Sequence, residues 1–152
     1  MSIQNKIEAD LKIALKSRDA LKVSALRMVL SEIHNLEIKV QKFDLPDSDV
    51  LTILWQGVKK RKDSISQFRK GDREDLAARE EAEIKIIETY LPKAIAVSEL
   101  EGLVKAAVVE ASMSGAVANI GAVMKIVMPK VKGQADGATI SDLVKKEFSK
   151  QT

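Results

Sequence analysis

The 152-residue chain has no cysteine, so it can form no disulfide and offers no thiolate to a metal ion or a substrate. It contains only three prolines and seven glycines, which leaves room for long uninterrupted helices. Aromatic residues make up 3% of the chain, so its core must be built from aliphatic side chains and few rings remain to stack on nucleic-acid bases. This composition favours an all-α fold over a sheet.

No apolar run reaches the roughly 18–20 residues that span a membrane, and the N-terminus lacks the apolar block of a secretory signal peptide. We therefore expect a cytoplasmic protein with no membrane association. The net charge is +3 and the isoelectric point is near 9.0, an excess too small to indicate a nucleic-acid partner by itself.

Catalytic and metal-binding patterns are scarce. The one histidine, His34, lies beside apolar helical positions, so we interpret it as a rim or semi-buried residue and not as a general base. The chain has no Gly-x-Ser-x-Gly elbow, no Walker loop and no dinucleotide-binding glycine motif. We expect no cofactor, no metal ion and no catalysis by this chain alone.

Apolar residues recur three and four positions apart along the first 92 residues, which predicts four helices with short connections. We therefore expect an N-terminal four-helix antiparallel bundle as a first domain, residues 1–92. Ser2 and Asp19 are expected to cap the first two helices. Gly71 is expected to end the third helix in the left-handed conformation, and Asp72 to cap the fourth.

The remaining residues, 93–152, predict a small three-helix tail domain. Asn119 is placed to cap the second of these helices, and Pro129 is expected to end it because proline lacks a backbone N–H. Asp136 is expected to cap the last helix, which carries three lysines near the C-terminus.

The segment that follows Pro129 is a candidate phosphate contact. Lys130, Lys132 and Gly133 form a short cationic loop whose glycine allows close backbone approach, and Lys125 lies one helical turn before the proline. Taken without other information, the loop is more simply a turn between two small helices with exposed lysines.

A second basic patch lies in the first domain. Lys59, Lys62 and Arg69 are spaced three and seven residues apart, so they fall along one side of the expected third helix. Acidic residues follow closely in the sequence, and we favour charge balance over RNA contact for this patch.

Several segments, in this order along the chain, resemble the GatB/YqeY family: Leu26–Val29, Val58–Ser64, Gly71–Leu76, Tyr90–Pro92 and Asn119–Gly137. The resemblance covers the whole chain and is to stand-alone YqeY-like proteins, which are similar to the helical and tail domains of the aspartyl/glutamyl-tRNA amidotransferase B subunit. It implies two helical domains and a tail that helps to hold tRNA, while amide transfer takes place in a separate catalytic domain. The label that such membership carries is carbon–nitrogen ligase with glutamine as amido-N-donor.

By this resemblance the RNA-binding residues would be Lys125, Lys130, Lys132 and Gly133. The leading hypothesis is a non-catalytic tRNA-binding or amidotransferase-associated module, whose partners would be tRNA and an amidotransferase or a tRNA synthetase. The alternative is a helical protein–protein adaptor without RNA binding, for which Met113, Met124 and Met128 would supply an adaptable apolar surface.

Overall fold

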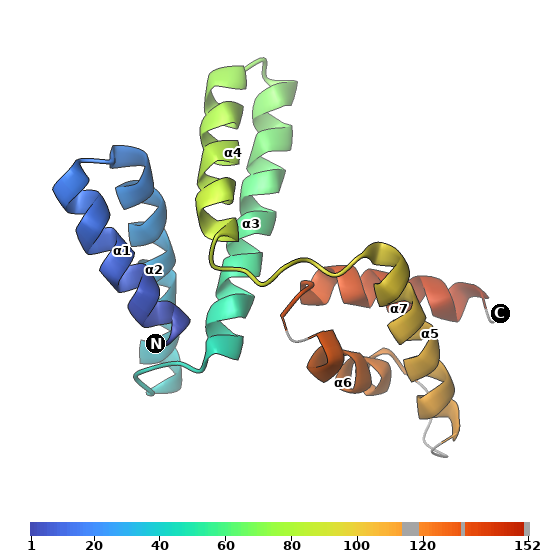
Figure 1. The fold of residues 1–152 in the computed structure, drawn as a ribbon. Coiled ribbons are helices and arrows are strands. Elements are labelled where there is room, and N and C mark those ends of the chain that lie inside the picture. Colours follow the sequence, from blue (N-terminus) through green and yellow to red (C-terminus); the bar gives the residue numbers. More distant parts are fainter. Residues whose placement is uncertain (114–118, 132, 151–152) are drawn as a thin grey trace. The chain divides into compact units, whose positions relative to one another are not determined.

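The computed structural model describes residues 1–113, 119–131 and 133–150, and these residues form seven helices and no strand (Figure 1). The predicted all-α class is therefore confirmed. The chain divides into two compact units, Met1–Leu91 and Pro92–Thr152. The N-terminal unit holds α1 (Ile3–Ser17), α2 (Ala20–Val40), α3 (Asp47–Lys70) and α4 (Glu74–Glu88), and the tail unit holds α5 (Val97–Met113), α6 (Ile120–Val131) and α7 (Gly137–Lys150).

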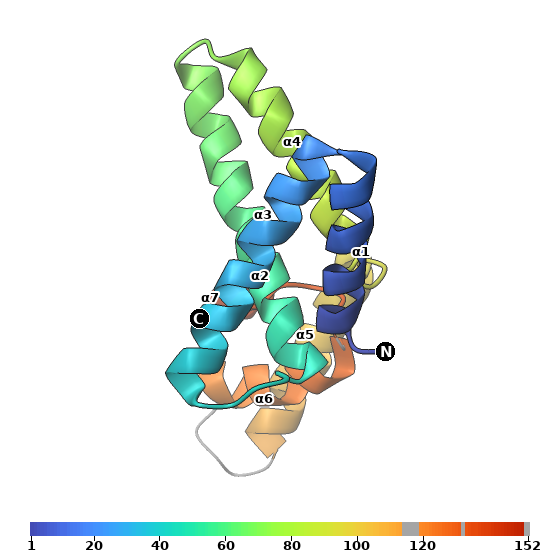
Figure 2. The same cartoon turned by 90° about the vertical axis from the view of Figure 1, so that its left-hand side faces the viewer.

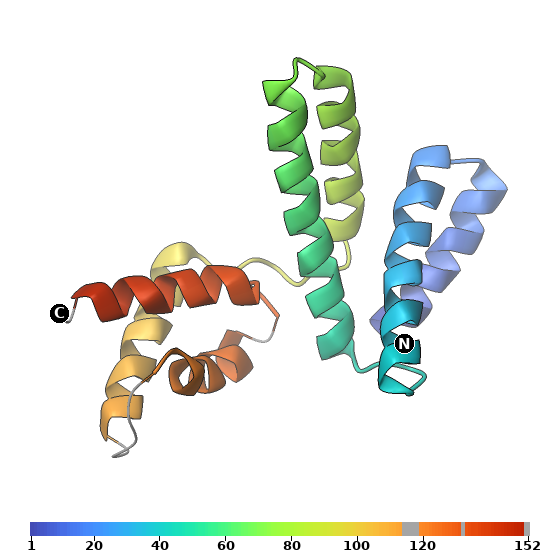
Figure 3. The ribbon, with the colours of Figure 1, turned by 180° about the vertical axis from the view of Figure 1, so that it is seen from behind.

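Two helical hairpins make up the N-terminal unit. One is α1 with α2 and the other is α3 with α4, and α2 packs against both helices of the second hairpin (Figures 1 and 3). The α3–α4 hairpin extends beyond the end of α1–α2, as the view in Figure 2 shows. The core between the hairpins is aliphatic and includes Leu26, Ile33, Leu54 and Ile87.

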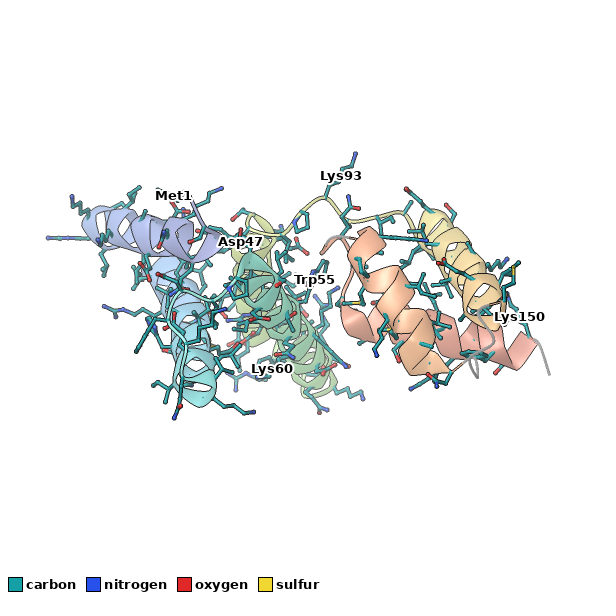
Figure 4. All side chains as sticks on the ribbon, turned by 90° about the horizontal axis from the view of Figure 1, so that it is seen from below. Met1, Asp47, Trp55, Lys60, Lys93 and Lys150 are labelled. Carbon is teal, nitrogen blue, oxygen red and sulfur yellow. The ribbon has the colours of Figure 1, made fainter. Side chains whose placement is uncertain are left out.

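The helix starts follow from their capping residues. The Ser2 hydroxyl accepts a hydrogen bond from the Asn5 N–H at 3.1 Å, and the Asp19 carboxylate accepts one from the Lys22 N–H at 3.1 Å. Both predicted caps are therefore confirmed. Asp47, labelled in Figure 4 beside Met1, accepts a hydrogen bond from the Ile3 N–H at 3.0 Å, which fixes the start of α1 against the start of α3.

The predicted roles of Gly71 and Asp72 are wrong. Gly71 has φ −93°, and Asp72, with φ 56°, is the residue in the left-handed conformation. The turn closes one residue later than predicted, because the Arg73 N–H reaches back to the Phe68 carbonyl at 2.8 Å. Aspartate tolerates the left-handed region better than most residues, so Asp72 can adopt this conformation without a glycine.

A buried arginine ties the two hairpins together. Arg61 on α3 is 6% exposed, and its Nε lies 3.2 Å from a carboxylate oxygen of Glu83 on α4. Its guanidinium also donates to the Gly57 carbonyl at 3.2 Å and to the Met28 sulfur on α2 at 3.5 Å. A Cβ at Gly57 would lie 3.3 Å from Arg61 Nη1, so the glycine leaves the space that this guanidinium fills. The segments Leu26–Val29 and Val58–Ser64 therefore meet at a structural contact.

Two further polar contacts hold α1 in place. Gln4 donates to the buried carboxylate of Glu37 at 2.9 Å, and His34 donates to the other oxygen of that carboxylate at 2.9 Å. These hydrogen bonds, that from His34 first, lower the pKa of Glu37. In the middle of α1, Asp10 accepts a hydrogen bond from the Tyr90 hydroxyl at 2.5 Å, and burial of the phenol raises the pKa of Tyr90.

The three helices of the tail unit pack pairwise around a separate aliphatic core that includes Val104, Val127 and Ile140. The Asn119 amide oxygen accepts from the Ala122 N–H at 2.8 Å, and the Asp136 carboxylate accepts from the Thr139 N–H at 2.6 Å. The predicted caps of the last two helices are thus confirmed.

Pro129 does not end α6, contrary to the prediction from sequence. The helix continues for two residues and ends at Val131, which is fully buried in the tail core. Proline removes one backbone hydrogen bond here, but burial of a valine side chain stabilises the fold by about 1.5–3 kcal/mol. The extra half-turn is retained because it brings Val131 into the core, and it places Lys130 on the helix and not in a loop.

Candidate nucleic-acid interface

Lys130 lies in the last turn of α6, where its ammonium is 3.6 Å from a carboxylate oxygen of Glu110 on α5. The side chain of Lys130 is 46% exposed and that of Glu110 is 62% exposed. An ion pair this open to water contributes little to stability and exchanges readily for another anion. Lys130 therefore remains accessible to a phosphate.

Lys125 and Lys130 do not share a face of α6. Both are exposed, but they are five residues apart on a continuous helix, which separates them by roughly 140° around its axis. Gly133 has φ 79°, a conformation that favours glycine, so its place in the turn after α6 has a backbone reason. Lys132 lies outside the described residues. RNA binding by this set of residues stays a prediction, and a contact that joins Lys125 to Lys130 would have to wrap around the helix.

The lysines of α7 are a more open cationic group. Lys145, Lys146 and Lys150 are all exposed, and Figure 4 labels Lys150 near the end of this helix. Lys146 and Lys150 are four residues apart, so they project from one side of α7. The ion pairs among the described residues include none of these three lysines. They are available to anions outside the chain.

The second predicted patch, on α3, is partly neutralised. Lys59 and Lys62 are exposed. Arg69 is bound through its Nε to Glu74 at 3.2 Å and through a terminal nitrogen to Glu81, and these hydrogen bonds raise the pKa of Arg69. This arrangement agrees with the charge balance that the acidic residues of the sequence indicate.

Other arginines of the N-terminal unit are engaged in the same way. Arg73 is paired with Asp75 at 3.2 Å, and Arg79 lies 3.9 Å from Glu83. Helices α3 and α4 thus differ from α7: in the described residues, the guanidinium groups of α3 and α4 meet carboxylates of the chain, whereas the ammonium groups of α7 do not.

Sequence reasoning missed the inward position of Arg61. Arg61 is one of four consecutive cations, residues 59–62, and the predicted basic patch includes only Lys59 and Lys62 of that run. Its spacing from Gly57 and Ile65, four residues on either side, places it on the buried stripe of α3. That periodicity was the signal available in the sequence. Glu83 pairs with the buried guanidinium. Burial raises the pKa of the neighbouring Glu80, and the like charge of Glu83 raises it further.

The described residues contain no group of three or more histidine, cysteine, aspartate or glutamate side chains that could hold a metal ion. Among them, too, no helix is both long enough and apolar enough to cross a membrane.

Comparison with known proteins identifies relatives for most of the chain. The family model described as "Yqey-like protein" matches residues 4–148. The chain is 41% identical over 85 residues to altered inheritance of mitochondria protein 41, mitochondrial, of Vanderwaltozyma polyspora, a match that covers 56% of this chain and 46% of that protein. The protein of the same name from Lachancea thermotolerans is 40% identical over 95 residues, which covers 62% of this chain and 51% of the relative. The chain therefore spans about half the length of these curated relatives.

These comparisons correct one prediction and leave another open. The cytoplasmic location is wrong, since the relatives are named as mitochondrial proteins and point to the mitochondrion. The lack of an apolar block at the N-terminus argues only against a secretory signal peptide. The likeness to the amidotransferase B subunit stays a prediction, because the family match concerns YqeY-like proteins alone. With a family model that spans residues 4–148, the chain belongs to the YqeY family.

Proposed function

We propose that this protein is a non-catalytic module that binds structured RNA, tRNA first, through the lysines of its tail unit. The observation that supports the proposal is the contrast between α7 and the arginine-rich α3–α4 region of the N-terminal unit. Lys145, Lys146 and Lys150 on α7 are exposed and take part in no ion pair among the described residues. Arg61, Arg69 and Arg73 of the N-terminal unit, in contrast, are paired within the chain. Unpaired ammonium groups are the ones that gain from contact with phosphate.

Recognition would depend on the phosphate backbone and not on the bases. The only aromatic residue of the tail unit is Phe148, and it is half-buried against the tail core. A surface without exposed rings cannot stack on unpaired bases, whereas lysines act as point charges toward phosphates at any sequence. The expected RNA class is therefore one with a folded, regularly spaced backbone, as tRNA has.

The likeness to the amidotransferase B subunit, which we advance here as part of the proposal, gives the RNA a context. Mischarged Glu- or Asp-tRNA is the substrate of that enzyme, and the part of its B subunit similar to this chain helps to hold the tRNA. We propose that this chain contributes RNA contact to such an enzyme, or to a tRNA synthetase, and performs no amide transfer itself.

A binding titration tests the proposal. Fluorescence anisotropy with labelled bulk tRNA would be measured for the wild type and for a triple variant with Lys145, Lys146 and Lys150 each changed to Glu. We expect the triple variant to bind ~10- to 100-fold more weakly at about 100 mM salt, because three phosphate contacts are lost and replaced by repulsion.

The matched control changes the same charge at a different place. Lys12, Lys16 and Lys39 are also exposed, lie in the N-terminal unit and enter no ion pair among the described residues, so their triple change to Glu alters the net charge equally. Circular dichroism checks that both variants are folded. Equal losses in the two variants would show that only net charge matters, and unaltered binding by the α7 variant would refute the proposal.

The residues predicted from the sequence can be placed in the same titration. Lys125→Glu and Lys130→Glu separate the two sides of α6, and a paired change of Lys59 and Lys62 to Glu tests the patch on α3. Strong loss in the α3 variant alone would move the RNA site to the N-terminal unit and contradict the proposal.

The second candidate, a helical protein–protein adaptor, has an observation in its favour. Met113 is 82% exposed and Met128 is 40% exposed, although Met124 packs against the tail core. Exposed methionines suit adaptable apolar contacts. Binding of a helical protein by a chain that does not bind tRNA would favour the adaptor over the RNA module.

A further inference from the structure

The solvent face of α5 carries an apolar stripe with no partner among the described residues. Gly102, Ala106, Val109 and Met113 are all exposed, and they follow one another at spacings of four, three and four. Val109 is 57% exposed and Met113 is 82% exposed. The opposite side of the helix supplies the tail core with Leu100, Val104, Ala107, Val108 and Ala111. α5 is therefore apolar on two faces, of which this unit buries one.

The spacing of this stripe is the heptad spacing of helices that pair along a seam. In heptad terms, Ala106 and Met113 occupy one core position and Gly102 and Val109 the other. Gly102 leaves open space, since a Cβ built there meets no atom within 4 Å. Glycine in a helix interior weakens the helix relative to alanine. It would, however, allow the backbone of a second helix to approach closely, and no helix among the described residues does so at Gly102.

The charges that flank the stripe indicate which helix would pair with it. Lys105 and Glu110 lie on its two sides and are five residues apart, the separation that brings opposite charges of two parallel helices together across a seam. Two copies of α5 that pair in parallel would set Lys105 of each copy against Glu110 of the other. An antiparallel pair would instead bring equivalent flanks together, Lys105 side to Lys105 side.

We propose that this face of α5 binds a second copy of the same chain, with the two α5 helices parallel. The contact runs from Gly102 to Met113, about 17 Å of helix at 1.5 Å per residue. Glu99 lies one heptad before Ala106 and would meet its own equivalent, so like charge ends the seam there. Glu110 exchanges its exposed intrachain partner Lys130 for Lys105 of the other copy. A seam of this length gives a weak dimer that forms at high concentration.

Cysteine cross-linking tests the arrangement. Because the chain has no native cysteine, any disulfide must come from the introduced thiols. In the parallel pair, thiols introduced by Ala106→Cys face each other across the seam at a separation that a disulfide can bridge. The control is Thr139→Cys, an exposed position at the start of α7. Under mild oxidation we expect a covalent dimer from Ala106→Cys and none from Thr139→Cys at the same concentration.

The charge pairs provide an independent arm that needs no cysteine. Lys105→Glu or Glu110→Lys should each weaken self-association, measured by sedimentation velocity, by ~10-fold, because each creates two like-charge contacts by symmetry. The double variant with both changes should restore the wild-type association.

Three results would overturn the proposal. One is a strictly monomeric wild-type chain at several hundred micromolar, and another is equal cross-linking of the two cysteine variants. The third is preferential cross-linking between Gly102→Cys and Met113→Cys chains, which would show an antiparallel seam. Circular dichroism of each variant confirms that a loss of association is not a loss of the fold.

Discussion

Replacing the buried Arg61 by alanine should destabilise the N-terminal unit strongly, unlike the replacement of an exposed charge in the same unit. Arg61→Ala removes a buried guanidinium that bonds Glu83, the Gly57 carbonyl and the Met28 sulfur, and so separates α3 from both α4 and α2. Removing one partner of a buried ion pair costs about 3–5 kcal/mol. The Glu83 side chain retains 10% exposure, so water can reach part of the orphaned carboxylate, and we expect a loss of about 3 kcal/mol.

The assay uses the single tryptophan. Trp55 lies on α3, so its fluorescence reports unfolding of the N-terminal unit without interference from the tail. Urea titration should show a much lower midpoint for Arg61→Ala and a smaller decrease for Arg61→Met, which keeps the packing of the aliphatic stem. The matched control is Arg73→Ala, whose exposed pair with Asp75 should leave the midpoint unchanged. Equal midpoints for Arg61→Ala and Arg73→Ala would refute the reasoning, because burial would then have no consequence.

Two further predictions concern acid and the tail backbone. Hydrogen bonds from His34 and Gln4 lower the pKa of Glu37 in the folded state, so their stabilisation is present above the ordinary value of 4.5 and is lost as the pH falls through the lower folded value. The urea midpoint of Trp55 fluorescence should therefore fall less between about pH 6 and about pH 3.5 in Glu37→Gln than in the wild type, and equal falls would contradict the assignment. In the tail, Gly133→Ala forces a side chain to φ 79° and should destabilise the unit by about 1–2 kcal/mol in thermal unfolding followed by circular dichroism. Gly102→Ala, a helical position with open space, should instead stabilise it by up to ~1 kcal/mol, and the same sign for both substitutions would show that backbone conformation is not the cause.

The helical class and the starts of the helices could be predicted from sequence because their causes are local. A capping side chain bonds a backbone N–H two or three residues away, so Ser2, Asp19, Asn119 and Asp136 each carry their own signal. The pairing of α5 with the other tail helices and the route of α2 past both α3 and α4 depend on contacts between distant residues, for which no local pattern exists.

The failures have the same physical origin. Pro129 carries a strong local signal to stop a helix, but the burial of Val131 in the tail core outweighs it. Because α6 continues past Pro129, Lys130 lies on the helix and on a different side from Lys125, so the two lysines do not form the single site predicted from sequence. Arg61 stands among three lysines in the sequence, and its spacing from Gly57 and Ile65 is the only local sign that it faces inward, where the contact between the two hairpins buries it.

The central claim, that α7 presents ammonium groups to an RNA backbone, is tested most directly by the salt dependence of tRNA binding. Each phosphate contact contributes about 0.9 to the slope of the logarithm of affinity against the logarithm of salt concentration for a duplex. Neutralising Lys145, Lys146 and Lys150 as glutamines should flatten the slope by roughly 2–3 units. An identical slope for this variant and the wild type would show that these lysines release no counterions on binding, and the account would be wrong.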